Sequence, residues 1–290
     1  MSVIVWSGGA LRAPGEPIIT ATDHGLTVGD GVFETLTIRD GQPFALTRHL
    51  ARLRYSAERI GLAEPDADAV RAGIAAVMEA GAGALTRLRV TVTSGQGPMS
   101  SARGDGPQTV VVTGGQAARP HVCHAVRAPW HRNERSPLAG VKSTSYGENA
   151  VMAAYARDKG ADEAIVANTH GNLCEGTATN VFVEVDEEIV TPPLASGCLP
   201  GITRGLALEW AAQAGLPIRV AAPGELTMSV LDAAIEGRAH LAVTSSTRGV
   251  QHIASLDGHD LAAGRLLRKL GALFELNAER DPDPAPRRSS

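Results

Sequence analysis

Aromatic residues are scarce in this 290-residue chain, at 3% of its composition. The core must therefore be built mainly from Ala, Val, Leu and Ile, since hydrophobic residues together make up 43%. The charged fraction of 20% is ordinary for a folded protein, and the length suffices for one large or two ordinary domains. The sequence has no basic stripe with interleaved aromatics, and its net charge is −4, so we expect no nucleic-acid partner.

Long apolar runs and paired cysteines are missing too. No stretch reaches about 18 consecutive apolar residues, so we expect no membrane partner. The opening residues "MSVIVWSGGALRAP" lack the basic start and long apolar run of a signal peptide. Cys123, Cys174 and Cys198 are far apart, odd in number and without CxxC spacing, which indicates neither a metal site nor a disulfide framework. We expect a soluble protein of the reducing cytoplasm.

The pattern of apolar residues predicts an α+β protein in two domains. Residues 1–118 are expected to form a mostly antiparallel sheet with two helices, including a hairpin with its turn at Asp40-Gly41. Residues 119–139 are predicted to link this domain to a second one at 140–277. The polar, proline-rich tail 278–290 is predicted to be disordered.

The first expected helix has one apolar stripe, and an arginine that lies off it. The stripe repeats at steps of four and three residues, at Leu46, Leu50, Leu53, Ala57 and Ile60. Arg52 lies well away from this stripe, so nothing in the pattern forces it into the core. It can therefore bind an anion or simply face the solvent.

One lysine is separated from other basic residues. Lys142, in "LAGVKSTSYGENAV", has no other basic residue between Arg135 and Arg157, and its neighbours are small, apolar or hydroxylic. An amine in dry surroundings loses its proton more readily and can act as a nucleophile or base. The alternative is an ordinary solvated lysine at the end of a strand.

Three other stretches offer polar groups suited to a phosphorylated ligand. Pro200-Gly201 precede an expected helix whose first N–H groups, at Ile202 and Thr203, can bind phosphate, although an ordinary capped helix fits as well. The hydroxyls of residues 245–247 can bind the same kind of anion or form a simple turn. Glu175 lies among small residues, where a carboxylate must pair with a cation or stay wet. Pyridoxal 5'-phosphate needs all of these groups: an amine for its aldehyde, a cradle for its phosphate, and an acid for its ring nitrogen.

The motifs, taken in order, resemble the class IV, fold-type IV pyridoxal-phosphate enzymes. These include branched-chain and D-amino-acid aminotransferases and 4-amino-4-deoxychorismate lyase. The likeness covers roughly residues 3–275, through "DHGLTVGDGVFET", "RHLARLRYSA", "LAGVKSTSYGEN", "GADEAIVANTHGNLCEGTATNVFVE", "TPPLASGCLPGITRG" and "TSSTRGVQ". It implies the two-domain fold of the D-amino-acid aminotransferase type, a cofactor-binding second domain, and a homodimer.

The resemblance also implies roles for individual residues. Lys142 is similar in position to the lysine that forms the Schiff base and shuttles protons, and Glu175 to the glutamate that pairs with the pyridine nitrogen. Arg52 matches the arginine that holds the phosphate. The other cofactor contacts that the resemblance implies are Tyr146 at the ring hydroxyl and Ile202, Thr203, Ser246 and Thr247 at the phosphate.

The positions expected to bind substrate depart from the aminotransferase patterns. Met99 stands where D-amino-acid aminotransferases have an arginine, and Thr35 follows "VFE" where branched-chain enzymes usually have glycine. Arg103 could replace the loop arginine of the lyase from enteric bacteria. Arg248 is expected to reach a carboxylate of a dianionic substrate, with a solvated loop arginine or an interdomain salt bridge as the alternative. Phe33 completes this predicted set.

The motifs most resemble the lyase members of the family. The expected activity is that of a 4-amino-4-deoxychorismate lyase, which gives p-aminobenzoate and pyruvate through a Lys142 Schiff base in folate biosynthesis. The alternative is an aminotransferase with the same cofactor site, of the branched-chain type or with another amino donor. A non-catalytic cofactor-binding protein is disfavoured by the presence of both Lys142 and Glu175. The expected partner is a small-molecule amine, and no metal is expected.

Overall fold

The structure is a computed structural model that describes residues 3–118 and 122–286. The chain divides into two compact units. The first comprises residues 1–118, 141–146 and 281–290, and the second comprises residues 119–140 and 147–280.

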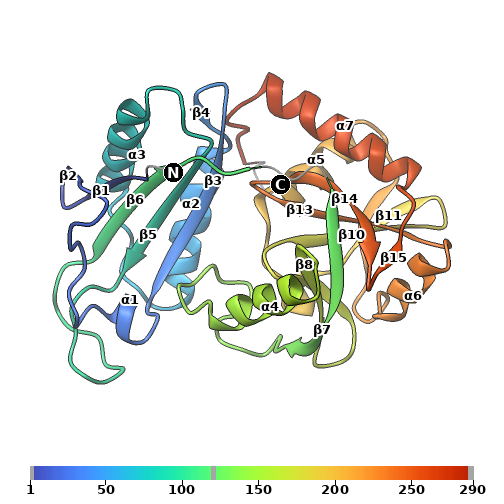
Figure 1. Cartoon of the computed structure of the whole chain (residues 1–290), viewed down its shortest axis with the longest axis horizontal. Helices are drawn as coiled ribbons and strands as arrows, with labels where there is room; N and C mark the ends of the chain where they lie inside the picture. Colours follow the sequence, from blue (N-terminus) through green and yellow to red (C-terminus); the bar gives the residue numbers. More distant parts are fainter. Residues whose placement is uncertain (1–2, 119–121, 287–290) are drawn as a thin grey trace. The chain divides into compact units, whose positions relative to one another are not determined.

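The first unit contains one antiparallel sheet in the order β2-β1-β6-β5-β3-β4 (Figure 1). The strands are β1 (Ile4–Ser7), β2 (Ala10–Arg12), β3 (Gly31–Arg39), β4 (Gln42–Pro43), β5 (Arg87–Thr93) and β6 (Thr109–Gly115). The expected hairpin between β3 and β4 is confirmed. Its turn residues Asp40 and Gly41 have φ of 47° and 74°, as a two-residue turn that follows the strand twist requires. The residues between β2 and β3 are mostly loop and turn and contain the short α1 (His24–Thr27).

Two helices pack against one face of this sheet. They are α2 (Leu46–Arg59) and α3 (Ala67–Gly81), the second of which begins at the N-cap Asp66. The expected stripe of α2 joins a core formed with the even-numbered residues of β3 and β5, such as Val32, Leu36 and Val90. Because side chains alternate along a strand, the odd-numbered residues of β3 and β5 lie on the opposite face.

The second unit is built on a nine-stranded mixed sheet. Its main path is β12-β11-β10-β13-β14-β7-β8-β9, and β15 pairs with β14. The strands are β7 (Cys123–Arg132), β8 (Glu163–Asn168), β9 (Leu173–Gly176), β10 (Asn180–Val185), β11 (Glu188–Thr191), β12 (Ile218–Val220), β13 (His240–Ser245), β14 (Gly249–Leu256) and β15 (His259–Asp260). Strands β8 and β9 and most of β10 are buried, together with the polar residues Glu163, Asn168 and Glu175 that they carry.

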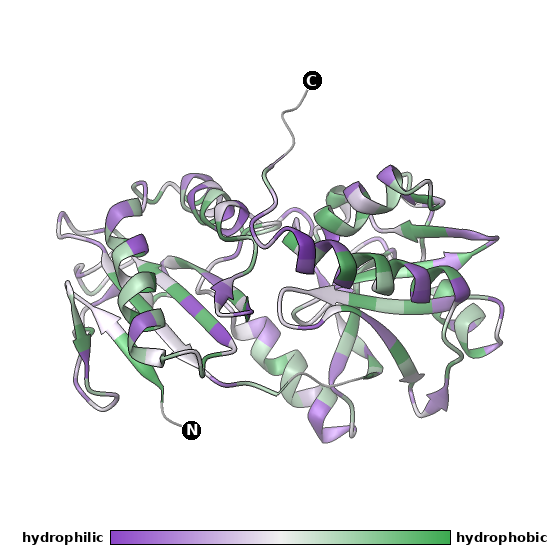
Figure 2. Ribbon diagram, turned by 90° about the horizontal axis from the view of Figure 1, so that it is seen from above, coloured by the Kyte–Doolittle hydropathy of each residue, from purple (hydrophilic) through white to green (hydrophobic). Residues whose placement is uncertain are grey.

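The helices of the second unit are α4 (Gly147–Asp158), α5 (Ile202–Gln213), α6 (Ser229–Ile235) and α7 (Arg265–Arg280), with a short 3-10 turn at Leu194–Ser196. In Figure 2, α7 shows the two-sided hydropathy of an amphipathic helix. Its buried face meets α5 through Trp210 and Phe274, whose ring centroids are 5.2 Å apart. None of the helices in the described ranges is both long and apolar enough to cross a membrane.

The structure differs from the expected domain boundaries in three places. The predicted linker contains β7, a strand inside the second sheet, while residues 119–121 lie outside the described ranges. Residues 141–146 group with the first unit, because their backbone pairs with β3. The predicted disordered tail begins too early, since α7 continues to Arg280 and residues 282–285 are bonded to the start of α2. Residues 287–290 lie outside the described ranges.

Candidate active site

The backbone around Lys142 is fixed from two directions within the first unit. Phe33 N donates to the Lys142 carbonyl at 3.0 Å, and Thr144 N donates to the Gly31 carbonyl at 2.8 Å, so this segment lies along β3. Lys142 N also donates to Ser56 Oγ of α2 at 3.3 Å. The sheet and the helix together therefore determine where this lysine lies.

The amine of Lys142 lies against two aromatic rings. Its Nζ is 4.3 Å from the ring centroid of Phe33 and 5.6 Å from that of Tyr146. The two rings meet edge to face, with centroids 5.1 Å apart. The structure thus brings together three residues that the sequence singled out. The chain has two other lysines, Lys159 and Lys269, and both are exposed.

Arg89 is a neighbour that the sequence reasoning missed. Its guanidinium carbon lies 3.8 Å from the Phe33 ring centroid, close enough for a cation–π contact. Arg89 pairs directly across the strands with Thr35, so these two residues and Phe33 share the sheet face opposite the core. Burial lowers the pKa of Arg89, although its guanidinium stays charged. A cation placed in this way can bind a carboxylate.

A buried charged cluster lies on the core side of β3. Glu34 is 1% exposed and accepts two hydrogen bonds from Arg52, from Nε and Nη2, both at 2.7 Å. His49 Nδ1 lies 2.7 Å from the same carboxylate. Burial by itself would raise the pKa of Glu34, but Arg52 and His49 lower it to about 2. Burial also lowers the pKa of His49, against the pull of Glu34.

This cluster corrects the solvent-facing alternative for Arg52. The arginine does lie off the apolar stripe, yet it is only 8% exposed. It can be buried because Glu34 supplies the opposite charge at a core-facing position of β3. The sequence held a signal for this cluster, since the even positions 32 and 36 are apolar and position 34 is a glutamate.

In the second unit, Glu175 is held at the end of β9. One carboxylate oxygen accepts from Leu199 N at 2.9 Å, and the other lies 3.3 Å from Nε of Arg132. Arg132 also pairs with Glu148 of α4 at 2.9 Å. Glu175 is 8% exposed. It is thus a largely buried carboxylate held by a backbone N–H and an arginine.

The first turn of α5 begins beside that carboxylate. Its N-cap Gly201 provides no side-chain cap for the N–H groups of Ile202 and Thr203. A Cβ at position 201 would lie 2.0 Å from Asn180 Oδ1, so a side chain there would have to displace Asn180. Asn180 Nδ2 donates to the Leu199 carbonyl at 2.8 Å, which fixes the turn before the helix. Such a helix start can bind phosphate.

Asn180 also connects this turn to the predicted hydroxyl segment. It begins β10 and pairs in register with Thr244 of β13. Strand β13 ends at Ser245, and Ser246 and Thr247 follow directly. Thr244 is 1% exposed, and its Oγ1 is a buried oxygen without a hydrogen-bond partner within the described ranges. The second unit therefore gathers Glu175, the α5 start and the hydroxyl segment around one asparagine.

A second buried acid, Glu163, holds the turn between β9 and β10. Glu163 is 2% exposed, and its carboxylate accepts from Thr177 N at 2.6 Å and Thr179 Oγ1 at 3.1 Å. These two threonines lie in the turn between β9 and β10. Glu163 therefore holds the turn that joins Glu175 to Asn180. Burial raises its pKa, although the threonines and Arg248 act in the opposite direction.

The two arginines expected to bind substrate have partners within their own units. Arg103 forms a paired ion contact with Asp30, at 2.7 Å for both Nε and Nη2. Arg248 Nη1 donates to Gln251 at 2.8 Å, and its Nη2 reaches the Asp162 carbonyl at 3.4 Å. These two partners of Arg248 are an amide and a backbone carbonyl of the second unit. A role in substrate binding stays a prediction for both residues.

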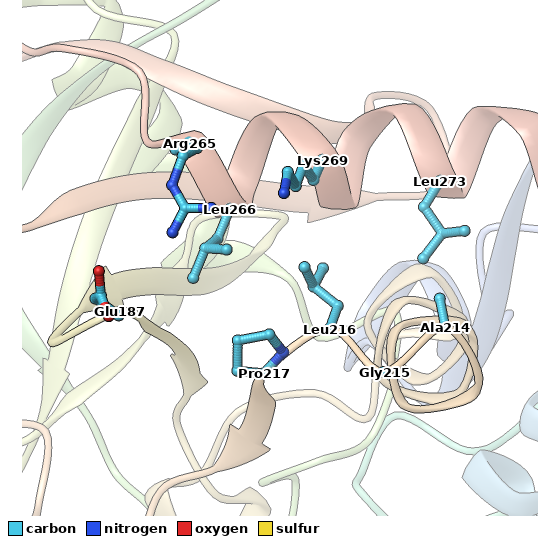
Figure 3. Close-up of a pocket in the computed structure, with 9 residues that line it drawn as sticks. All are labelled: Glu187, Ala214, Gly215, Leu216, Pro217, Arg265, Leu266, Lys269 and Leu273. Atoms are coloured by element: carbon cyan, nitrogen blue, oxygen red, sulfur yellow. The ribbon is translucent and has the colours of Figure 1, made fainter.

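A separate pocket lies in the second unit, between α7 and the segment that follows α5 (Figure 3). Its volume of about 520 Å³ could admit a small ligand. None of the predicted site residues lines it; the lining residues are Glu187, Ala214, Gly215, Leu216, Pro217, Arg265, Leu266, Lys269 and Leu273.

The groups in the two units fit pyridoxal 5'-phosphate. Lys142 offers an amine, Glu175 a buried carboxylate, and α5 a helix start without a side-chain cap. The hydroxyl of Thr244 adds a buried oxygen without a partner in the described part of the chain. Each unit by itself thus carries groups of the kinds that a phosphorylated aldehyde cofactor needs.

Comparison with known proteins identifies the family. Residues 31–256 match the model of the amino-transferase class IV family, and the chain belongs to that family. It is therefore a pyridoxal-phosphate-dependent enzyme, which confirms the expected cofactor.

Three similar proteins illustrate the range of the family. A bifunctional aminodeoxychorismate lyase / D-amino acid transaminase from Mycobacterium tuberculosis is 28% identical over 239 residues, covering 73% of this chain and 79% of that protein. The structure of a fold IV transaminase from Curtobacterium pusillum matches with a TM-score of 0.79 and 28% identity, over 94% of this chain and 99% of that one. The structure of 4-amino-4-deoxychorismate lyase from Pseudomonas aeruginosa matches with a TM-score of 0.78 and 26% identity, over 96% and 99%. The expected α+β, two-domain, type IV fold is confirmed.

The buried pair around Glu34 gives a prediction with a definite sign. Replacing Glu34 by Gln leaves the Arg52 cation buried without its counter-ion, so the free energy of unfolding should fall by about 3 kcal/mol or more. The folded-state pKa is lowered to about 2, so the contribution of Glu34 is present above the unfolded pKa of about 4.3 and is lost as pH falls toward 2. Denaturant unfolding between pH 5 and 3 should show the wild type and the variant converging. Glu279→Gln, at an exposed site, is the control. A difference in unfolding free energy between the wild type and Glu34→Gln that stays constant over this pH range would contradict the prediction.

Glu163 should show the opposite pH dependence. Its folded-state pKa is raised, so its contribution to stability is greatest below the unfolded pKa of about 4.3 and is lost as pH rises through the folded-state value. Because glutamine does not titrate, the wild type should lose stability relative to Glu163→Gln as pH rises from 4 to 8. Denaturant unfolding at several pH values measures this difference. If the free energy of unfolding of the wild type, relative to that of the variant, stays constant or rises with pH, Glu163 is charged in the fold.

Proposed function

We propose that the chain is a 4-amino-4-deoxychorismate lyase that releases p-aminobenzoate and pyruvate. The observation that carries the proposal is Arg89, a cation stacked on Phe33 beside the Lys142 amine. This arrangement suits an anionic amine with an unsaturated ring, since the arginine can bind a carboxylate and the aromatic ring can face the ring of the substrate. The names of the Mycobacterium tuberculosis and Pseudomonas aeruginosa relatives also support a lyase.

Lys142 and Glu175 perform the proton chemistry in this proposal. When bound, pyridoxal 5'-phosphate supplies an aldehyde that condenses with amines and a ring that accepts electrons. Lys142 Nζ would take the proton from the carbon that bears the substrate amine and give a proton to the leaving enolpyruvate, since that carbon carries no hydrogen once the ring is aromatic. Glu175 keeps a proton on the ring nitrogen, and its bonds to Leu199 and Arg132 hold the carboxylate in place.

The remaining cofactor residues bind the cofactor and orient it. We assign the phosphate to the α5 start, to the hydroxyl segment after β13, and to the buried guanidinium of α2. The hydroxyl of Tyr146 is assigned to the ring oxygen of the cofactor. The phosphate set is Arg52, Ile202, Thr203, Ser246 and Thr247.

The alternative is an aminotransferase, and the two reactions differ in where the amine ends. In the lyase reaction the amine stays on the ring, enolpyruvate leaves, and the ring becomes aromatic, so no keto-acid acceptor is needed. A transaminase instead passes the amine to a keto acid. The double name of the Mycobacterium tuberculosis relative favours keeping this second function. By the same family resemblance we propose a cytoplasmic homodimer that acts in folate biosynthesis.

A single assay separates the two functions. The wild type, loaded with cofactor and given aminodeoxychorismate without a keto acid, should form fluorescent p-aminobenzoate over many turnovers. Lys142→Ala should abolish this product, because no other amine is placed to move the proton. The matched control Lys159→Ala changes an exposed lysine and should leave the rate unchanged. If no product forms while an L- or D-amino acid bleaches the visible band of the cofactor, the chain is a transaminase.

A further inference from the structure

The end of the chain returns to the start of α2 within the first unit. Residues Asp281–Pro286 follow α7, and the Pro282 carbonyl accepts from Ala45 N at 2.7 Å. The carboxylate of Asp283 accepts from Thr47 N at 2.8 Å and from Thr47 Oγ1 at 2.7 Å. Two further carbonyls of the segment, those of Pro284 and Ala285, accept from the side chain of Arg48 at 2.9 and 2.7 Å. The segment is therefore bonded to three residues at the start of α2, Ala45, Thr47 and Arg48.

Asp283 acts as the cap that α2 lacks locally. The residue at the N-cap position is Ala45, which has a left-handed backbone with φ of 54° and no side-chain acceptor. An N-cap side chain normally accepts from the second or third N–H of the helix, and Asp283 accepts from the second, that of Thr47. Its negative charge also suits the positive end of the helix. The cap thus comes from a residue 236 positions away in the sequence.

Helix α2 is bonded both to β3 and to the segment that carries Lys142. His49 and Arg52 bind the carboxylate of Glu34, and Ser56 Oγ accepts from the backbone N–H of Lys142. Arg52 lies five residues beyond Thr47, about 7.5 Å along the helix axis. A shift or fraying of the first turn would therefore reach the guanidinium that we assign to the cofactor phosphate.

We propose that Asp281–Pro286 is a positioning segment for the phosphate-binding Arg52, and that Asp283 is the residue through which it acts. The inference rests on the phosphate role proposed for Arg52. It makes the end of the chain part of the support for the cofactor site, although no residue of the segment needs to touch the cofactor.

The test compares two ligands in full-length variants. Dissociation constants are measured for pyridoxal 5'-phosphate and for pyridoxal, which has the same ring and aldehyde but no phosphate. Asp283→Ala should weaken binding of the phosphorylated ligand by up to about fivefold, the equivalent of one lost helix cap, and leave binding of pyridoxal nearly unchanged. Asp283→Asn, which keeps one acceptor oxygen for Thr47 N, should lie between the alanine variant and the wild type. Asp281→Ala, an exposed site in the same segment, should match the wild type.

Two outcomes would overturn the proposal. If Asp283→Ala lowers the unfolding midpoint but leaves both dissociation constants unchanged, the segment is a cap for stability alone. If it weakens both ligands equally, the segment does not act through the phosphate. Should the alanine variant fail to fold, the same comparison is made with Asp283→Asn. Neither constant depends on whether the substrate is aminodeoxychorismate or an amino acid, so failure of the lyase assay is a separate result.

Discussion

The carboxylate of Glu34 is the interaction on which the first unit depends. It lies on the core side of β3 and neutralises Arg52 of α2, in a place where neither charge could be buried alone. Because this pair fixes α2 against β3, it also fixes the two elements that hold the backbone of Lys142. The opposite face of β3 carries Phe33 and, across the strands, Arg89. One strand thus carries the buried ion pair on one face and the aromatic neighbour of the Lys142 amine on the other.

The sequence predicted the local elements of the fold better than their long-range pairing. The β3–β4 hairpin and α2 follow from a glycine turn and from helical periodicity, which are local signals. Strand β7 was missed because its partners, β8 and β14, lie far away in the sequence, and a pattern shows only that a segment is apolar. The end of the chain was misread for a similar reason. Its composition is that of a disordered tail, and its order comes from bonds to α2.

The site was partly predictable for chemical reasons. Lys142 could be singled out because nucleophilic amines need small, dry neighbours, and the scarcity of lysine in the chain would have sharpened that choice. Arg89 and Glu163 could not be found in this way, since each gains its meaning from a ring or a turn on another strand. Arg248 looked available from its place beside the hydroxyls, yet the structure bonds it to Gln251. The sequence shows which charged and polar side chains are present, but it does not show which residues they bond in the fold.

The central claim is that Lys142 carries the cofactor. Borohydride treatment of the holoenzyme fixes pyridoxal 5'-phosphate covalently to the amine that holds it, and peptide mass mapping then locates the added mass. The chain has three lysines, which lie far apart in the sequence, so the modified peptide identifies the lysine without ambiguity. The account predicts the modification on the peptide that contains Lys142. Stoichiometric modification of Lys159 or Lys269 instead, with Lys142 unmodified, would contradict it.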